Sequence, residues 1–411
     1  MSSAALRSLM GVYAEEAERC IRCGFCNSVC PTTLTSIGYA PSRTSRGRLV
    51  MLQSTMILER PRPFDGGFKE LIDLCFGCMR CLQVCPAGIP IPLVNSSFRA
   101  AYHAHTGGSR ISRSERLLSS LGEVAPALNK YPPLWRLLAN RLSLRMLKAV
   151  AGLAKDAPIP VPEPRSLDTH LRGEQKAGYK LYALFADTYA RYIRPSIGLD
   201  ARHLLNKAGI DIYLPQQHDS GVIHLELGLW DKLRKLAALN TASLYKEAVE
   251  GRRILCTSPA STMMLREVYP QLVPGEASKT VADSVTDINE LLYELVTEEG
   301  ITDLRIRGTI TLHSSCLSQH LKLTPKVRAV FESLGAQVEE VRTECCGSGG
   351  AWGLQRKNRA LSVEIGSRLT ARLSGTVVSY SETCVEQIRS LGGGRFEAYL
   401  PHQAILRMQR P

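Results

Sequence analysis

The thirteen cysteines of this 411-residue chain fall into two arrangements that differ in spacing. Near the start stand two similar runs, "CIRCGFCNSVCP" at residues 20–31 and "CFGCMRCLQVCP" at residues 75–86. Further along, single or paired cysteines lie at Cys256, Cys316, Cys345, Cys346 and Cys384. Thiolates are ligands of zinc and of iron–sulfur clusters. In a large chain with no expected secretory signal, cysteines are more often such ligands than disulfide partners.

Both runs read C-x2-C-x2-C-x3-C-P, the spacing found in bacterial two-cluster ferredoxins. Three thiolates on one short loop can reach three irons of one cubane, while the fourth cysteine leaves in another direction before the proline. In such pairs the fourth cysteine binds the other cluster. The spacing therefore predicts two [4Fe–4S] clusters with exchanged ligands. The first would use Cys20, Cys23, Cys26 and Cys85, and the second Cys75, Cys78, Cys81 and Cys30.

Zinc is the alternative, but zinc sites generally combine two separated cysteine pairs rather than four cysteines in one run, twice. Iron–sulfur clusters are therefore favoured. Between the runs, "SRTSRGRLVMLQSTMILER" predicts a helix with Leu49, Leu52 and Met56 on one apolar stripe. Residues 1–103 are thus expected to form an α-helical ferredoxin domain.

The chain is basic, with a formal net charge of +13. Such a charge favours an acidic partner, a membrane surface or nucleic acid without choosing among them. No basic groove interleaved with aromatic residues supports nucleic-acid binding, so none is expected. Arg43, Arg46 and Arg48 stand before or at the start of the predicted helix. A partner and an anionic cluster are two alternatives for what they face, but exposure to solvent is the favoured interpretation.

Residues 104–178 are predicted to be a basic linker with one amphipathic helix, "LWRLLANRLSLRMLKAVAGLAK" at residues 134–155. One face of that helix would carry Trp135, Leu138, Leu142, Met146, Ala149 and Leu153. Beside this face stand Arg141, Arg145, Lys148 and Lys155, and the segment contains no acidic residue. A basic amphipathic helix of this kind either lies on a membrane surface or packs against its own protein or a partner subunit. Both alternatives stay open.

Two later segments repeat one pattern, because "AGIDIYLPQQHDSG" and "LGAQVEEVRTECCG" match from Gly209 to Gly221 and from Gly335 to Gly347. Each follows a strand-like run and a helical stretch, and each precedes another strand, loop and helix. The pattern predicts one α/β unit used twice, over residues 179–304 and 305–411. The overall fold class is therefore mixed, with a helical ferredoxin domain followed by two α/β units.

In the second unit, cysteines occupy the loops where open α/β sheets usually carry their sites. These residues are Cys316, Cys345, Cys346 and Cys384, and they predict a third iron–sulfur centre of undetermined type. The glycines after the cysteine pair would let backbone amides approach the cluster. In the first unit the matching positions hold Thr188, Asp219, Ser220 and Ser261, so that unit is expected to have lost the site. Cys256 is interpreted as a buried structural thiol, and His313, His320 and His402 as structural side chains.

Together, the two runs and "HSSC…ECCGSGG…SETC" resemble the iron–sulfur subunits of glycolate oxidase and of anaerobic glycerol-3-phosphate dehydrogenase, in the latter its C subunit. This family with CCG domains is related to heterodisulfide reductase. The resemblance implies a non-catalytic electron-transfer subunit that takes electrons from a partner subunit with bound FAD. That partner would oxidise glycolate, lactate or glycerol 3-phosphate, and the electrons would pass towards quinone.

Two departures from the family pattern weigh against the alternative function, a thiol–disulfide reductase subunit like heterodisulfide reductase. The last part of the full motif is C-x2-C, but here it reads Ser381-Glu382-Thr383-Cys384, and the first unit lacks motif cysteines. No G-x-G-x-x-G follows a strand, so no flavin or nicotinamide site and no catalytic residue is expected in this chain. The expected location is cytoplasmic, peripheral on the inner face of the cell membrane.

Overall fold

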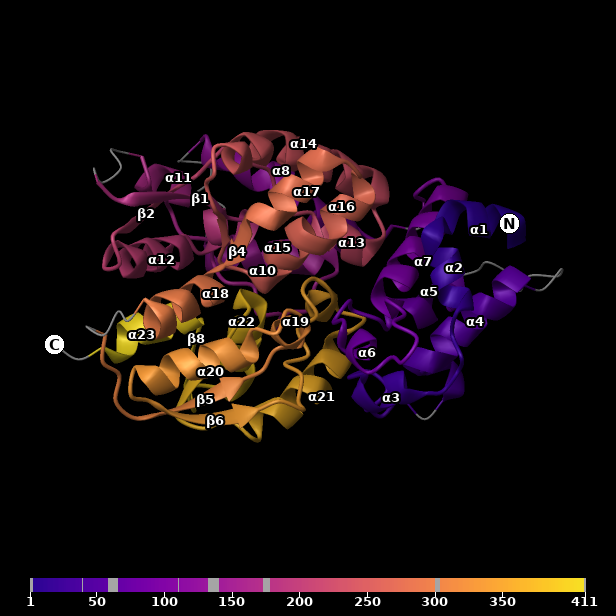
Figure 1. The fold of residues 1–411 in the computed structure, drawn as a ribbon. Helices are drawn as coiled ribbons and strands as arrows, with labels where there is room; N and C mark the ends of the chain where they lie inside the picture. Colours follow the sequence, from indigo (N-terminus) through magenta and orange to yellow (C-terminus); the bar gives the residue numbers. More distant parts are fainter. Residues whose placement is uncertain are drawn as a thin grey trace.

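The computed structural model describes residues 3–38, 40–57, 66–109, 111–131, 140–172, 178–299 and 304–409. Figure 1 shows a helical N-terminal part on the right and two α/β units on the left, one above the other. The described part is thus a mixed helical and α/β structure, as the sequence predicts. No helix in these ranges is long and apolar enough to cross a membrane.

The N-terminal part is helical because short helices surround the two cysteine runs. Its elements are α1 (Ser3–Met10), α2 (Val12–Glu18), α3 (Phe25–Val29), the 3₁₀ turn η1 (Pro41–Arg43), α4 (Ser45–Ile57), α5 (Gly66–Asp73), α6 (Arg80–Gln83) and α7 (Ile91–His105). On α4 the predicted stripe of Leu49, Leu52 and Met56 is buried against α1, α2 and α7. Burial of this stripe, rather than helix propensity, holds α4 between the two runs.

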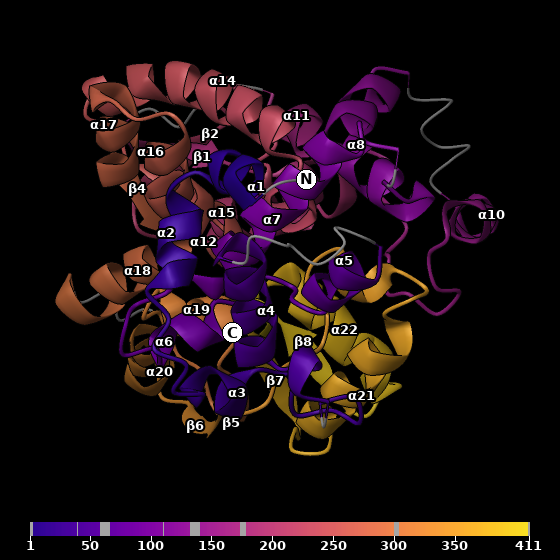
Figure 2. The ribbon, with the colours of Figure 1, turned by 90° about the vertical axis from the view of Figure 1, so that its right-hand side faces the viewer.

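The linker contributes α8 (Arg113–Asn129), α10 (Arg141–Ala151) and α11 (Leu167–His170). Helix α8 begins at a capping box in which Ser112 and Glu115 satisfy each other's backbone amides. Helix α10 stands away from the rest of the molecule in Figure 2. Of the predicted amphipathic helix, Trp135 and Leu138 lie outside the described residues.

Each α/β unit contains a parallel four-stranded sheet. In the first, β1 (Lys180–Phe185), β2 (Ile210–Tyr213), β3 (Ile254–Cys256) and β4 (Val285–Asp287) follow the order β2-β1-β3-β4. In the second, β5 (Thr309–His313), β6 (Gln337–Val341), β7 (Thr376–Ser379) and β8 (Glu397–Tyr399) follow the order β6-β5-β7-β8. The two orders are the same, while descent from a duplicated unit with CCG motifs stays a prediction.

Helices cover both sheets and join the two units. The first unit contains η2 (Tyr189–Ile193), α12 (Ser196–Asn206), α13 (Val222–Leu227), α14 (Trp230–Val249), α15 (Pro259–Met263), η3 (Met264–Val268), α16 (Tyr269–Leu272), α17 (Glu276–Ser284), α18 (Ile288–Tyr293) and η4 (Glu294–Glu298). The second contains α19 (Cys316–His320), α20 (Thr324–Ser333), η5 (Trp352–Leu354), α21 (Arg359–Thr370), α22 (Glu382–Gly392) and α23 (Pro401–Met408). Because α18 packs on α20 and α12 on α23, side chains of both units share one hydrophobic core.

Candidate iron–sulfur centres

The first cysteine set, Cys20, Cys23, Cys26 and Cys85, lies around a single hollow of about 320 Å³, its mouth included. Cys20 and Cys23 lie in the loop between α2 and α3, Cys26 lies in α3, and Cys85 follows α6. The backbone N–H of Arg22 donates to Cys20 Sγ at 3.4 Å, and that of Ile89 to Cys85 Sγ at 3.4 Å. Cys23 is exposed. The fold thus brings a cysteine of the second run to the first loop, at the edge of the molecule.

The second set, Cys75, Cys78, Cys81 and Cys30, lies deeper. Cys81 and Cys30 are buried, and Cys75 and Cys78 are half-buried. Burial raises the pKa of Cys81, and the neighbouring thiolates of Cys78, Cys75 and Cys30 raise it further. This mutual effect means that the four thiols lie within electrostatic reach of one another, although Cys30 belongs to the other run.

The backbone of the two cysteine loops follows the same course. Arg22 and Gly77, each just before the second cysteine of its run, have φ values of 59° and 76°. Gly24 and Met79, each just after that cysteine, have φ values of 89° and 58°. Left-handed conformations are unfavourable for residues with a side chain, and alternation with right-handed ones turns successive N–H groups towards one point, as in anion-binding nests. Such loops fit a bound anionic cluster.

The third set, Cys316, Cys345, Cys346 and Cys384, lies where three strands of the second sheet end. Cys316 follows β5, the adjacent pair follows β6, and Cys384 follows β7. Strands β5 and β7 flank the point where the strand order reverses, which is the usual ligand position in open parallel sheets. Cys346 Sγ and Cys384 Sγ are 2.9 Å apart, and the Gly347 N–H donates to Cys345 Sγ at 3.4 Å.

The glycines that follow the cysteine pair also allow close packing, while their predicted role of letting backbone amides approach a cluster stays a prediction. Gly347 has φ +76°, and an added Cβ would lie 2.2 Å from the Ser362 carbonyl oxygen. At Gly349 a Cβ would lie 2.7 Å from the Phe76 side chain, and at Gly350 it would lie 2.4 Å from Glu226 Oε1. These glycines therefore allow close packing against α21, the second cysteine loop and α13.

The second and third sets are neighbours. Burial raises the pKa of Cys78, and the next largest contribution comes from Cys316 of the third set. Gln83 donates from Nε2 to the Cys316 carbonyl at 3.4 Å, and Arg80 donates to the Thr343 carbonyl at 2.9 Å. Since Cys30 and Cys26 also lie close to each other, the three sets follow one another from the exposed Cys23 into the protein.

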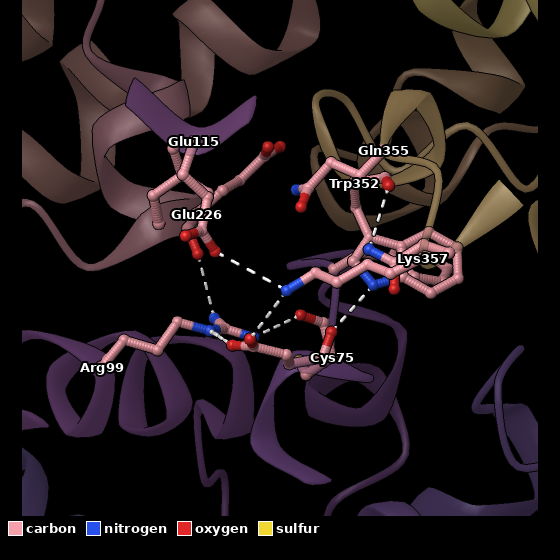
Figure 3. Close-up of a pocket in the computed structure, with 11 residues that line it drawn as sticks. Cys75, Arg99, Glu115, Glu226, Trp352, Gln355 and Lys357 are labelled. Atoms are coloured by element: carbon pink, nitrogen blue, oxygen red, sulfur yellow. Dashed lines mark hydrogen bonds and ion pairs between the residues drawn. The ribbon is translucent and has the colours of Figure 1, made fainter. Parts of the chain in front are cut away.

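A polar cavity joins the N-terminal part to both α/β units behind the second set (Figure 3). Burial alone would raise the pKa of the Asp73 carboxyl, but Arg99, Lys69 and Lys357 together lower it. Arg99 Nε donates to Asp73 Oδ1 at 3.0 Å, and Lys357 Nζ lies 3.2 Å from Asp73 Oδ2. Glu226, whose pKa burial raises to about 8, accepts the Ala351 N–H at 3.2 Å. This network holds the second cysteine loop against the segment that follows Cys345 and Cys346.

The positions in the first unit that match the third set are filled by protein. Thr188 Oγ1 donates to Asp219 Oδ2 at 2.6 Å, and Ser261 Oγ donates to Asp187 Oδ2 at 3.2 Å. A Cβ at Gly122 of α8 would lie 2.9 Å from Asp219 Cβ, so the linker helix packs directly against these residues. Ser220 is buried beside them.

Cys256 and the three histidines lie outside the cysteine sets. Cys256 is fully buried on β3, where burial raises its pKa well above the ordinary value. His313 Nδ1 and Ser379 Oγ are 2.9 Å apart, His320 Nε2 and Glu267 Oε2 are 2.7 Å apart, and His402 Nε2 donates to the Ile197 carbonyl at 3.1 Å. Each histidine thus has a partner within the protein.

Arg48 corrects the favoured interpretation of the basic turn. Arg43 and Arg46 are exposed, but Arg48 is only 1% exposed, and its Nη2 donates to Cys30 Sγ at 3.3 Å. Burial would raise the pKa of Cys30, yet Arg48 and hydrogen bonds from Thr32 and Thr33 lower it to about 7. The sequence could not reveal this contact, because nothing in the spacing distinguishes Arg48 from its two neighbours.

The residues present fit iron–sulfur clusters better than single ions. Within the described ranges, no three His, Cys, Asp or Glu side chains are arranged to hold one metal ion. A [4Fe–4S] cubane instead takes one thiolate on each iron, which suits four cysteines spread around a hollow. The paired loops, with their inward N–H groups and separated thiols, have this form.

Comparison with known proteins also points to iron–sulfur clusters. Residues 16–89 match the model of the 4Fe-4S dicluster domain, so the chain contains a domain for two [4Fe–4S] clusters. It is an iron–sulfur protein, and its relatives include iron–sulfur subunits of oxidoreductase complexes, which is consistent with an electron-transfer subunit.

Its relatives bear the names that the motifs suggested. The chain is 26% identical over 395 residues to the C subunit of the anaerobic glycerol-3-phosphate dehydrogenase of Escherichia coli (strain K12), covering 90% of this chain and 93% of that one. It is 24% identical over 377 residues to the probable glycolate oxidase iron-sulfur subunit of Bacillus subtilis (strain 168), covering 85% and 82%. It also matches the D-2-hydroxyglutarate dehydrogenase of Escherichia coli (strain K12), at 24% identity over 321 residues, 74% of this chain and 30% of that one. The suspected family resemblance is confirmed.

Proposed function

We propose that this chain is the iron–sulfur electron-transfer subunit of a membrane-associated, flavin-dependent dehydrogenase of the glycolate/lactate or glycerol-3-phosphate type. A partner FAD subunit would supply electrons, and quinone would receive them. The observation that carries the proposal is the series of three adjacent cysteine sets, which begins at the exposed Cys23 and ends at the buried pair Cys345 and Cys346.

The proposed cluster ligands are the cysteines of the three sets described above. The first and second sets would each hold a [4Fe–4S] cluster, and the third set, Cys316, Cys345, Cys346 and Cys384, would hold a third iron–sulfur centre. When bound, such clusters accept and release single electrons. The protein positions the thiols, donates backbone hydrogen bonds to sulfur and buries most thiols of the second and third sets, although Cys75, Cys78 and Cys316 are half-buried.

The share of one longer relative that this chain matches supports a separate dehydrogenase partner. A segment like this chain makes up 30% of the longer D-2-hydroxyglutarate dehydrogenase chain, which leaves most of that chain for other parts. The two matches that cover most of both chains, by contrast, are named as subunits. Substrate oxidation by the pure chain alone would contradict the proposal.

Metal analysis of the anaerobically purified full chain tests the third centre. Two clusters account for roughly eight irons, and a third of the same size would bring the total to roughly twelve. The variant Cys384→Ser is expected to lose about four irons and one EPR signal of the reduced protein, because it removes one of the four proposed thiolate ligands of the third centre. Cys256→Ser is the matched control, because Cys256 is also buried but belongs to no set. Equal iron in both variants would exclude Cys384 as a required ligand, and roughly eight irons in the wild-type chain would rule out the third centre.

Helix α10 is the proposed membrane contact. Leu142, Met146 and Val150 follow one another at intervals of one turn and are 69%, 63% and 70% exposed. Leu153, which the sequence places on the same face, is buried against the second unit and anchors the end of the helix. Exposed apolar and basic side chains on one short helix are typical of interfacial binding.

Flotation with anionic phospholipid vesicles tests this contact. Val150→Glu should reduce the bound fraction, because it places a charge on the apolar face. Val249→Glu, at a similarly exposed position at the end of α14, should leave binding unchanged. Equal binding of both variants would point to a protein partner for α10.

The close contact of Cys346 and Cys384 favours one alternative, a thiol–disulfide reductase subunit. A heterodisulfide assay with a reduced electron donor distinguishes the two functions. Turnover that Cys346→Ser abolishes would favour the reductase, whereas no turnover in an iron-replete protein would favour the electron carrier.

A further inference from the structure

Arg48 is a buried cation without an acidic partner in the described part of the chain. Its side chain is 1% exposed, and it takes part in none of the ion pairs found among the described residues. Nη2 donates to Cys30 Sγ and Nη1 to Thr32 Oγ1, both at 3.3 Å. Nε has no hydrogen-bond partner within the described ranges. A buried guanidinium in this state is strongly unfavourable unless a nearby anion compensates it.

The anions that could compensate Arg48 belong to the second cysteine set. The ionisable groups that interact with the guanidinium are the thiols of Cys30, Cys75 and Cys81, three of the four proposed ligands of that cluster. Helix α4 thus carries the positive charge into the space between the two cysteine loops. Charges at short range in a water-poor interior act with little screening.

The first set has no equivalent cation among the described residues. Arg46 lines its hollow, but the Arg46 side chain is exposed, and its Nη1 donates to the Arg22 carbonyl at 3.4 Å. Solvent screens such a charge. Two loops with the same cysteine spacing and backbone course therefore present different electrostatic surroundings to their clusters.

We propose that Arg48 is the internal counter-cation of the second [4Fe–4S] cluster and holds its reduction potential above that of the first. The electron-transfer step moves one electron from the first cluster to the second and adds one negative charge to the second. The fixed positive charge of Arg48 favours the state that carries the extra electron. The inference rests on the proposed function, and it makes Arg48 a residue that directs electrons inward.

Two variants separate charge from hydrogen bonding. Arg48→Gln removes the charge and keeps a donor towards Cys30 and Thr32, while Arg48→Lys keeps the charge and loses the planar fork. Arg43→Gln is the control, because it makes the same change in net charge at an exposed residue of the neighbouring turn. The readout is a potentiometric titration of the anaerobic full chain followed by EPR, with the second-cluster signal assigned through Cys78→Ser.

We expect Arg48→Gln to lower the ratio of reduced to oxidised second cluster at least tenfold at a fixed potential. For a one-electron couple this corresponds to a downward shift of about 59 mV. Arg43→Gln should leave both potentials unchanged, and Arg48→Lys should keep most of the wild-type value. Unshifted potentials in Arg48→Gln would overturn the inference.

Two further outcomes are also decisive. If Arg48→Gln is purified without its second cluster, Arg48→Lys decides: wild-type iron and potential support the charge role, and wild-type iron with a lowered potential overturns it. If the wild-type chain itself contains no iron, the proposed function fails together with the inference. Normal iron with an unmoved potential refutes the role of Arg48 alone.

Discussion

Replacement of Gly349 by alanine tests whether the N-terminal part and the second α/β unit are held together at the cysteine loops. Gly349 has φ +54°, and a Cβ there would lie 2.7 Å from the Cβ and Cγ atoms of Phe76. Phe76 directly follows Cys75 and lies against Trp352, with ring centroids 4.9 Å apart. Trp352 Nε1 in turn donates to the Asp73 carbonyl at 2.8 Å. The new methyl group would therefore push into the loop of the second set.

Two costs add up in this variant. A left-handed backbone conformation costs an alanine about 1–2 kcal/mol relative to glycine. Overpacking against a buried aromatic ring costs about 1–3 kcal/mol more, because neither the ring nor the backbone can move freely. Gly349→Ala should thus destabilise the protein by about 2–5 kcal/mol.

Gly375→Ala provides a matched control. Gly375 has φ +56°, and no heavy atom lies within 4 Å of its would-be Cβ. It should show only the backbone cost of about 1–2 kcal/mol. Urea denaturation of the anaerobic holoprotein measures the loss of stability in both variants. Each loss is the shift in the denaturation midpoint multiplied by a common m-value. Freeze-quench EPR would in addition show slower reduction of the third centre in Gly349→Ala alone.

Equal losses of stability in the two variants would refute the reasoning. That result would mean that the contact between Gly349 and Phe76 carries no strain when a methyl group is added. The close approach of the second and third cysteine sets would then need a support other than this loop contact.

Two further predictions concern cluster assembly and pH. Cys85→Ser should remove the EPR signal of the first cluster, although Cys85 belongs to the second run. Cys30→Ser should likewise remove the signal of the second cluster. Loss of the second-cluster signal in Cys85→Ser and of the first-cluster signal in Cys30→Ser would contradict the exchange of ligands. Burial lowers the pKa of His402 to about 4, so between that value and about 6.5 the unfolded chain binds a proton that the folded chain does not, and stability falls as the pH falls. His402 alone should contribute about 2 kcal/mol to the loss of stability from pH 7 to pH 5, so that in urea denaturation His402→Asn should lose about that much less than the wild-type chain over this range.

Spacing in the sequence was informative where it matches a pattern of known geometry, as the two cysteine runs and the apolar stripe of α4 do. Cys85 lies in the hollow of the first loop and Cys30 beside the thiols of the second, a placement that agrees with the predicted exchange, while the binding of clusters by these sets stays a prediction. The apolar stripe of α4 could also be predicted, because Leu49, Leu52 and Met56 recur at the helical period.

Contacts between distant segments could not be predicted in this way. The role of Gly349 depends on Phe76, which is far away in sequence and has no pattern that links the two. In the same way, nothing in the first unit shows that Gly122 of the linker would pack on Asp219. Arg48 is buried beside Cys30 and Thr32, and periodicity alone cannot reveal what covers a helix end.

Because Cys85 lies with the first set and Cys30 with the second, neither centre can be completed by one segment of the chain. Insertion of iron and sulfide would therefore join two distant segments twice, as a pair of cross-links does, and would restrict the unfolded chain in the same manner. A nascent chain could not mature at its first cysteine run until the second had been synthesised. Oxidative loss of one centre would likewise release a segment of the other, so damage that begins at the exposed Cys23 of the first set would propagate to the second set.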